Sequence, residues 1–116
     1  MIVEIPLKLP SLNEYISAIN RSRYEGNAMK QSVQNDIAIF IKRLPRFEKP
    51  VVIHFHWIEG NKRRDYDNIA FAKKFILDAL VNCGKLKDDN RKCVIGFSDS
   101  FSYGKSFKVI LNITEV

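Results

Sequence analysis

Two aspartates separated by a single residue, Asp65 and Asp67, are the part of the sequence best suited to chemistry. They lie within the run RRDYDN at residues 63–68. In an extended segment, side chains two positions apart point the same way, so these carboxylates can share one divalent cation. Magnesium takes one or two carboxylates, and water and phosphate complete its coordination shell. The same run is also typical of a helix entry in which Asp65 or Asp67 caps the first turn, and the spacing leaves both interpretations open.

A second acidic pair, Asp88 and Asp89, lies among basic residues before the next expected strand. The first pair follows the end of one strand, whereas the second pair precedes the start of the next. If those strands are parallel, the two acidic pairs fall at opposite ends of the sheet. A shared site therefore requires the intervening helix to run back along the sheet, or a second copy of the chain. The sequence leaves both possibilities open.

A lysine accompanies these acids on the helix expected at residues 67–83. In a continuous helix, Asp67, Phe71, Lys74 and Asp78 form one narrow stripe. Most of the remaining circumference is apolar, which predicts that the helix is largely buried. Lys74 is then either the partner of Asp78 in an ordinary helical ion pair, or a group that reaches phosphate and balances the carboxylates.

The distribution of charge indicates an acidic partner. The chain has 116 residues, with 19 Lys and Arg against 13 Asp and Glu, a net charge of +6. Residues 46–64 hold five bases and two acids, a net of +3, whereas residues 65–91 hold five of each. A small basic domain favours nucleic acid first and an anionic membrane second. Carboxylates among bases suit a protein that approaches phosphate and holds a cation, but ordinary surface ion pairs give the same pattern.

One small domain must position these residues, because the length allows a single core. Residues 50–58 are apolar or aromatic on both faces, which predicts a central strand, and Pro6 indicates an edge position or a bulge in the first strand. The link from the central strand to the next one is long enough for a parallel crossover. The predicted fold is α/β, of the α+β kind, with a mixed sheet of about four strands, two to three helices and the order β-α-β-α-β-β. The strands are expected at 3–9, 50–58, 93–101 and 105–114, and the helices at 27–43 and 67–83.

Composition excludes several classes of protein. Hydrophobic residues make up 46% of the chain, which is typical of a packed core and not of disorder. Cys83 and Cys93 are too few for a disulfide framework or a four-cysteine zinc site, and free thiols indicate the reducing cytoplasm. His54 and His56 share a strand face with no third histidine, so we interpret them as packed or solvated strand residues. No apolar run reaches the ~18 residues of a membrane span.

Taken together, these segments resemble one family. The run at 63–68, the triplet Asp-Ala-Leu at 78–80, Gly84 and the pair at 88–89 resemble the RusA-type Holliday-junction resolvases. Residues 9–13, LPSLN, are similar to that family's early Pro-Ser-x-Asn segment. The resemblance covers nearly the whole chain in order. It implies one endonuclease domain over residues 1–116 that acts as a homodimer, uses Mg²⁺ or Mn²⁺ and no small-molecule cofactor, and makes paired nicks in four-way DNA junctions during recombination and repair.

The resemblance also implies roles for individual residues. By position, Asp65, Asp67 and Asp89 match the family's essential carboxylates, and Asp88 is the alternative to Asp89 as a metal ligand. Lys74 stands four residues before Asp78 and matches the family's important helical lysine, although the interval from Asp67 is about one helical turn longer than in the family pattern. The basic residues expected to contact the DNA backbone are Lys62, Arg63, Arg64, Lys73, Lys85, Lys87 and Arg91.

Two other functions stay open on the sequence. A non-catalytic module could bind nucleic acid through the same charges, with the acids as helix caps and ion pairs. A purely structural or interaction protein could be basic without binding nucleic acid. Aromatic residues near the C-terminus are expected to pack in the core or in a hairpin, with stacking on bases at a junction as the alternative. They are Phe97, Phe101, Tyr103 and Phe107.

Overall fold

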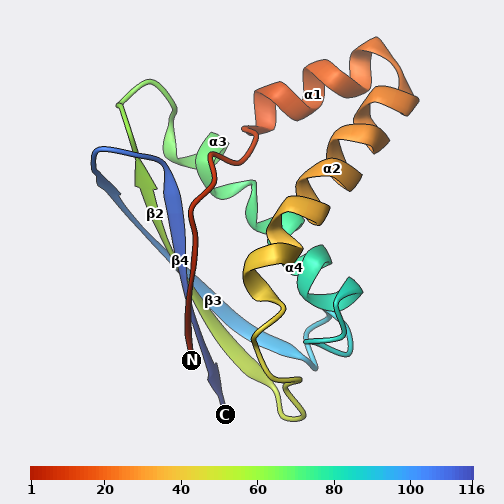
Figure 1. Cartoon of the computed structure of the whole chain (residues 1–116), viewed down its shortest axis with the longest axis vertical. Helices are drawn as coiled ribbons and strands as arrows, with labels where there is room; N and C mark the ends of the chain where they lie inside the picture. Colours follow the sequence, from red (N-terminus) through yellow and green to blue (C-terminus); the bar gives the residue numbers. More distant parts are fainter.

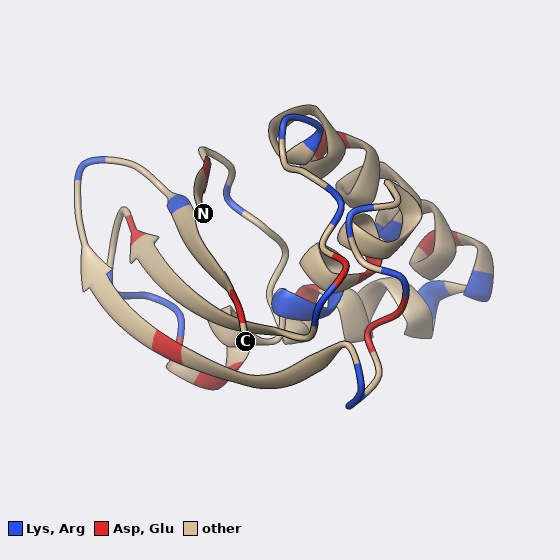
Figure 2. Ribbon diagram, turned by 90° about the horizontal axis from the view of Figure 1, so that it is seen from below, with Lys and Arg blue, Asp and Glu red and all other residues tan.

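The computed structural model describes all 116 residues and arranges them in two layers (Figure 1). One layer is a four-stranded sheet, and the helices all lie on one face of it, as the view in Figure 2 also shows. In chain order the elements are β1 (Ile2–Ile5), α1 (Leu12–Arg21), α2 (Arg23–Ile41), β2 (Val51–Glu59), α3 (Tyr66–Ala70), α4 (Lys73–Asn82), β3 (Val94–Tyr103) and β4 (Lys108–Glu115).

The predicted α+β fold and its element order are confirmed, with a pair of helices at each helical position. The helix expected at 27–43 is confirmed as α2, which begins earlier, at Arg23, and α1 is the additional helix that the range of two to three allowed. Ser11 explains the start of α1: its hydroxyl accepts from the Glu14 backbone N–H, and the Glu14 carboxylate accepts from the Ser11 N–H. This capping box satisfies two backbone donors at the helix start. Ser22 then caps α2 by accepting from the backbone N–H of Glu25.

The prediction of a single helix at 67–83 is wrong, because Phe71 and Ala72 separate α3 from α4. At this point the backbone bonds tighten: the Lys74 N–H donates to the Phe71 carbonyl, and the Phe75 N–H donates to the Ala72 carbonyl. Bonds over three residues are those of a 3₁₀ turn, which changes the direction of the side chains that follow. Asp67 therefore does not share one helical stripe with the lysine and aspartate of α4.

The sheet has the strand order β1-β4-β2-β3. Its parallel pair, β2 with β3, confirms the predicted crossover, and the other two pairs are antiparallel. The central place of β2 and the edge place of β1 are also confirmed. The two last strands are consecutive in the chain but are not neighbours, because β2 lies between them. Gly84, predicted just past the end of the helix, has a φ of +73° and ends the turn after α4.

The core lies between the sheet and the helices. Alternate residues of β2, among them Phe55 and Trp57, are buried on the helix side. The opposite face of the sheet carries no helix, and there the ring nitrogens of His54 lie 2.6 and 2.8 Å from the hydroxyls of Ser98 and Ser100. This bears out the interpretation of His54 as a strand residue with ordinary partners. No helix is long and apolar enough to cross a membrane.

Candidate active site

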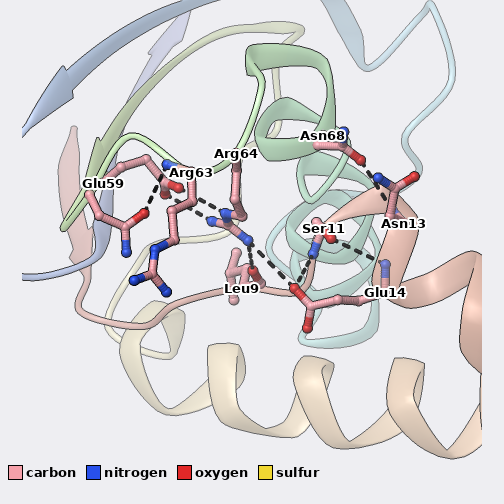
Figure 3. Close-up of polar contacts among 9 residues, drawn as sticks. Leu9, Ser11, Asn13, Glu14, Glu59, Arg63, Arg64 and Asn68 are labelled. Carbon is pink, nitrogen blue, oxygen red and sulfur yellow. Dashed lines mark hydrogen bonds and ion pairs between the residues drawn. The ribbon is translucent and has the colours of Figure 1, made fainter.

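The loop that carries Asp65 and Asp67 is fixed by the residue before it, Arg64 (Figure 3). Its Nε and Nη2 donate to the two carboxylate oxygens of Glu59, both at 2.8 Å, and its Nη1 donates to the carbonyl of Leu9 at 2.7 Å. Only 13% of the Arg64 side chain is exposed. Since Glu59 is the last residue of β2, this buried bidentate pair joins the end of the sheet to the segment before α1.

A second anchor lies on the other side of the acidic pair. The side-chain oxygen of Asn68 accepts a hydrogen bond from the backbone N–H of Asn13 at 3.1 Å (Figure 3). Segments 9–13 and 63–68 thus contact each other at two points. Neither role is predicted by the local sequence, because both contacts join segments that lie 55 residues apart in the chain.

Asp65 and Asp67 are exposed and have no hydrogen bond or ion pair through their side chains. Asp65 occupies the N-cap position of α3 in an extended conformation, but its carboxylate accepts no capping hydrogen bond. The capping interpretation is therefore wrong for Asp65. The extended-strand argument is also wrong, because β2 ends at Glu59 and Asp67 already belongs to α3. What remains is a pair of unpartnered carboxylates at the start of a helix, whose partial positive charge favours anions there.

Lys74 and Asp89 meet in a separate polar cavity of about 470 Å³ between α2, α4 and the loop at 85–92. The Lys74 ammonium lies 3.1 Å from Asp78 and 3.5 Å from Asp89, and Lys30 lies 3.4 Å from Asp78. The hydrogen bond from Lys74 to Asp78 raises the pKa of the lysine above its ordinary value, and the charges of both aspartates add to this effect. The predicted helical ion pair between Lys74 and Asp78 is confirmed.

The four predicted carboxylates are not gathered into one site. Asp88 accepts hydrogen bonds from the backbone of Asp89 and the side chain of Asn90, so it fixes its own turn. No three Asp, Glu, His or Cys side chains lie in a position to hold one metal ion together. The structure brings Asp89 to Lys74 and leaves Asp65 and Asp67 outside that cluster, without side-chain partners. Two free carboxylates suit Mg²⁺, which keeps much of its water.

The predicted DNA-binding residues divide into free and engaged groups. Lys62 and Arg63 are exposed, and the Arg63 side chain extends away from the Arg64 network (Figure 3). Lys87 and Arg91 are also exposed, whereas the Lys85 ammonium donates to the carbonyl of Lys42 at 2.9 Å. Basic and acidic segments follow one another along the loops in Figure 2.

Two of those assignments change, because Arg64 and Lys73 hold the fold together. The guanidinium of Arg64 is taken up by Glu59 and the Leu9 carbonyl. The Lys73 ammonium lies 2.6 Å from Asp99 of β3, and only 16% of its side chain is exposed. We therefore no longer expect either residue to contact DNA.

Comparisons with known proteins add no assignment. No protein-family model matches the chain, and no curated protein sequence matches it. The functional conclusion therefore rests on the sequence pattern and on the geometry described above.

Proposed function

We propose that the chain is a metal-dependent endonuclease that nicks four-way DNA junctions and acts as a homodimer. The observation that carries the proposal is the segment with Asp65 and Asp67: two exposed carboxylates without side-chain partners, at the N-cap and in the first turn of α3. Arg64 and Asn68 anchor this segment on either side, and the exposed bases Lys62 and Arg63 precede it in the sequence. Carboxylates left free beside unpaired bases suit a site that receives a cation and a phosphate.

Asp65 and Asp67 would hold Mg²⁺ or Mn²⁺, whereas Asp88 and Asp89 have partners elsewhere and are not part of this ligand set within one chain. A bound ion supplies charge stabilisation at the scissile phosphate and a more acidic water molecule. Side chains of the protein would supply the other functions needed for cleavage. Lys62 and Arg63 bind backbone phosphates without reading base sequence. Lys74 carries a positive charge at neutral pH as any lysine does, and its aspartate partners raise its pKa further. It would act on the phosphate only through DNA that also reaches the cavity between α2 and α4.

The homodimer follows from the substrate. One small domain offers one Asp65–Asp67 pair, whereas paired nicks need two sites. A two-fold dimer supplies two equivalent sites for two equivalent strands. A single chain that remains monomeric on the junction, measured by analytical ultracentrifugation, would remove this part of the proposal.

A non-catalytic nucleic-acid-binding module is the second candidate. It is favoured by the pairing of Asp89 and Asp78 with lysines and by the absence of a group of three metal-binding side chains. The two candidates differ in one measurable property, which is cleavage.

The test compares a mobile four-way junction with linear duplex of the same sequence, with and without Mg²⁺. We expect the wild type to nick only the junction and only with the metal. Asp67→Asn should still bind the junction and lose cleavage by more than about 100-fold. Asp36→Asn, which changes an exposed acid on α2, is the matched control and should cleave normally. Binding without any cleavage by the wild type would favour the module.

A further inference from the structure

An aromatic pair lies directly beside the two free carboxylates. Tyr66, the residue between Asp65 and Asp67, stacks on Phe101 of β3 with ring centroids 4.2 Å apart and ring planes 15° apart. Phe101 is half-buried and packs against the core, so it is a fixed support. Tyr66 is 53% exposed. Phe101 covers one face of its ring, so the remaining surface of the ring supplies the exposed area.

Tyr103 extends this cluster toward the free cations. It follows Phe101 by two residues on the same strand and therefore on the same face of β3. It is 43% exposed, and the Lys62 ammonium lies 5.1 Å from the centre of its ring. The neighbouring Tyr66 hydroxyl raises the pKa of Tyr103 above its ordinary value. A lysine thus sits over one of the two exposed tyrosines.

Core packing accounts for Phe101 but not for the two exposed tyrosines. A large aromatic surface beside a lysine offers two kinds of contact at once. The ring face can stack on a nucleobase, and the ammonium can bind the phosphate attached to it. The neighbouring acids would then lie close to the same stretch of backbone.

We propose that Tyr66, supported by Phe101 and Tyr103, is a stacking platform for one unstacked nucleobase of DNA beside Asp65 and Asp67. The choice of DNA as the ligand rests on the proposed function. The platform adds a substrate requirement to it. In a continuous duplex both faces of each base are covered by neighbouring pairs, whereas a branch point or a single strand offers an open face. The preferred ligand is therefore DNA that contains an unstacked nucleotide.

Binding measurements without metal test the platform separately from catalysis. Fluorescence anisotropy would give the affinity for a four-way junction, for a short unstructured single strand and for linear duplex, all in EDTA. Loss of one base–aromatic stack corresponds to binding weaker by about 5- to 150-fold. We expect Tyr66→Ala to weaken junction and single-strand binding within this range and to leave duplex binding unchanged. Tyr66→Phe and Tyr66→Trp should bind nearly as the wild type, because they keep a ring.

Tyr24→Ala is the matched control, since Tyr24 is an 81% exposed tyrosine on α2 and should not affect affinity. The platform is overturned if Tyr66→Ala binds all three DNAs like the wild type, or if Tyr66→Phe is as weak as Tyr66→Ala. It is also overturned if the wild type binds no DNA. That result would be expected if a second chain covered the Tyr66 surface. Cleavage by the wild type together with an unaffected Tyr66→Ala would remove the platform and keep the endonuclease. Binding that depends on the Tyr66 ring, without any cleavage by the wild type, would keep the platform and remove the endonuclease.

Discussion

The side-chain oxygen of Asn68 accepts a hydrogen bond of 3.1 Å from the backbone N–H of Asn13, which lies 55 residues earlier in the sequence. The bond fixes the first turn of α3 to the first turn of α1. Together with Arg64, which binds the Leu9 carbonyl, it makes segments 9–13 and 63–68 one structural unit. One segment carries the carboxylates, and the other holds them in place.

Removal of the Asn68 anchor should affect activity more than stability. The hydrogen bond is exposed, so Asn68→Ala should cost only about 0.5–1.5 kcal/mol of unfolding free energy. Junction cleavage should fall by about 10- to 100-fold, as it does when supporting partners of metal ligands are lost. Urea unfolding and single-turnover cleavage measure the two effects. Asn35→Ala, an exposed asparagine on α2, is the control; equal losses in both variants would contradict a positioning role for Asn68.

The Arg64–Glu59 pair should behave as a buried ion pair. Arg64→Met leaves the Glu59 carboxylate, of which 5% is exposed, without its partner and should destabilise the fold by about 3–5 kcal/mol. The double variant Arg64→Met with Glu59→Leu removes both charges and should recover much of this loss. Urea unfolding compares the variants. If Arg64→Met and the double variant are equally unstable, the bond to Leu9 and not the ion pair is the main contribution.

The sequence predicted the order of the elements because the apolar periods are clear in β2, α2 and α4. It did not predict the interruption between α3 and α4, since residues 69–75 contain no Gly or Pro. Phe71 is involved in that interruption: its ring lies 5.6 Å from the rings of Tyr15 and Phe75. Contacts of this kind depend on the position of α1, which local periodicity does not contain.

The site was predictable as a set of residue types but not as a set of partners. Asp65 and Asp67 could be named from their spacing, and so could the pairing of Lys74 with Asp78. The ion pairs of Arg64 with Glu59 and of Lys73 with Asp99 could not be predicted. Three consecutive basic residues look equivalent in sequence, yet only Arg64 reaches Glu59, because the loop at 60–65 turns that one side chain inward. Burial of single charged groups is a tertiary property.

Lys62 and Lys73 should therefore differ in two measurements. Lys62 is exposed and without an ion pair, so Lys62→Met should leave stability unchanged. The slope of log affinity for DNA against log salt concentration should fall by about 1, because one phosphate contact is lost. Lys73→Met leaves Asp99 with only the Trp57 indole N–H as a partner, at 2.8 Å. It should cost about 1–3 kcal/mol of stability and leave the salt slope unchanged. If Lys73→Met reduces the salt dependence of DNA binding, Lys73 contacts DNA and its assignment to the fold alone is wrong.

Asp78 should control the protonation of Lys74. Because its hydrogen bond is the main cause of the raised Lys74 pKa, Asp78→Asn should lower that pKa, and Asp89→Asn should lower it less. NMR titration of the lysine side chain measures both shifts. A raised pKa means that the folded state holds the proton more tightly than the unfolded state. The stabilisation is thus complete below the unfolded value of about 10.4 and is lost as the pH rises through the folded-state pKa. The stability difference between wild type and Asp78→Asn should stay constant near neutral pH and shrink in strong alkali. A larger shift in Asp89→Asn than in Asp78→Asn would reverse the assignment of the dominant partner.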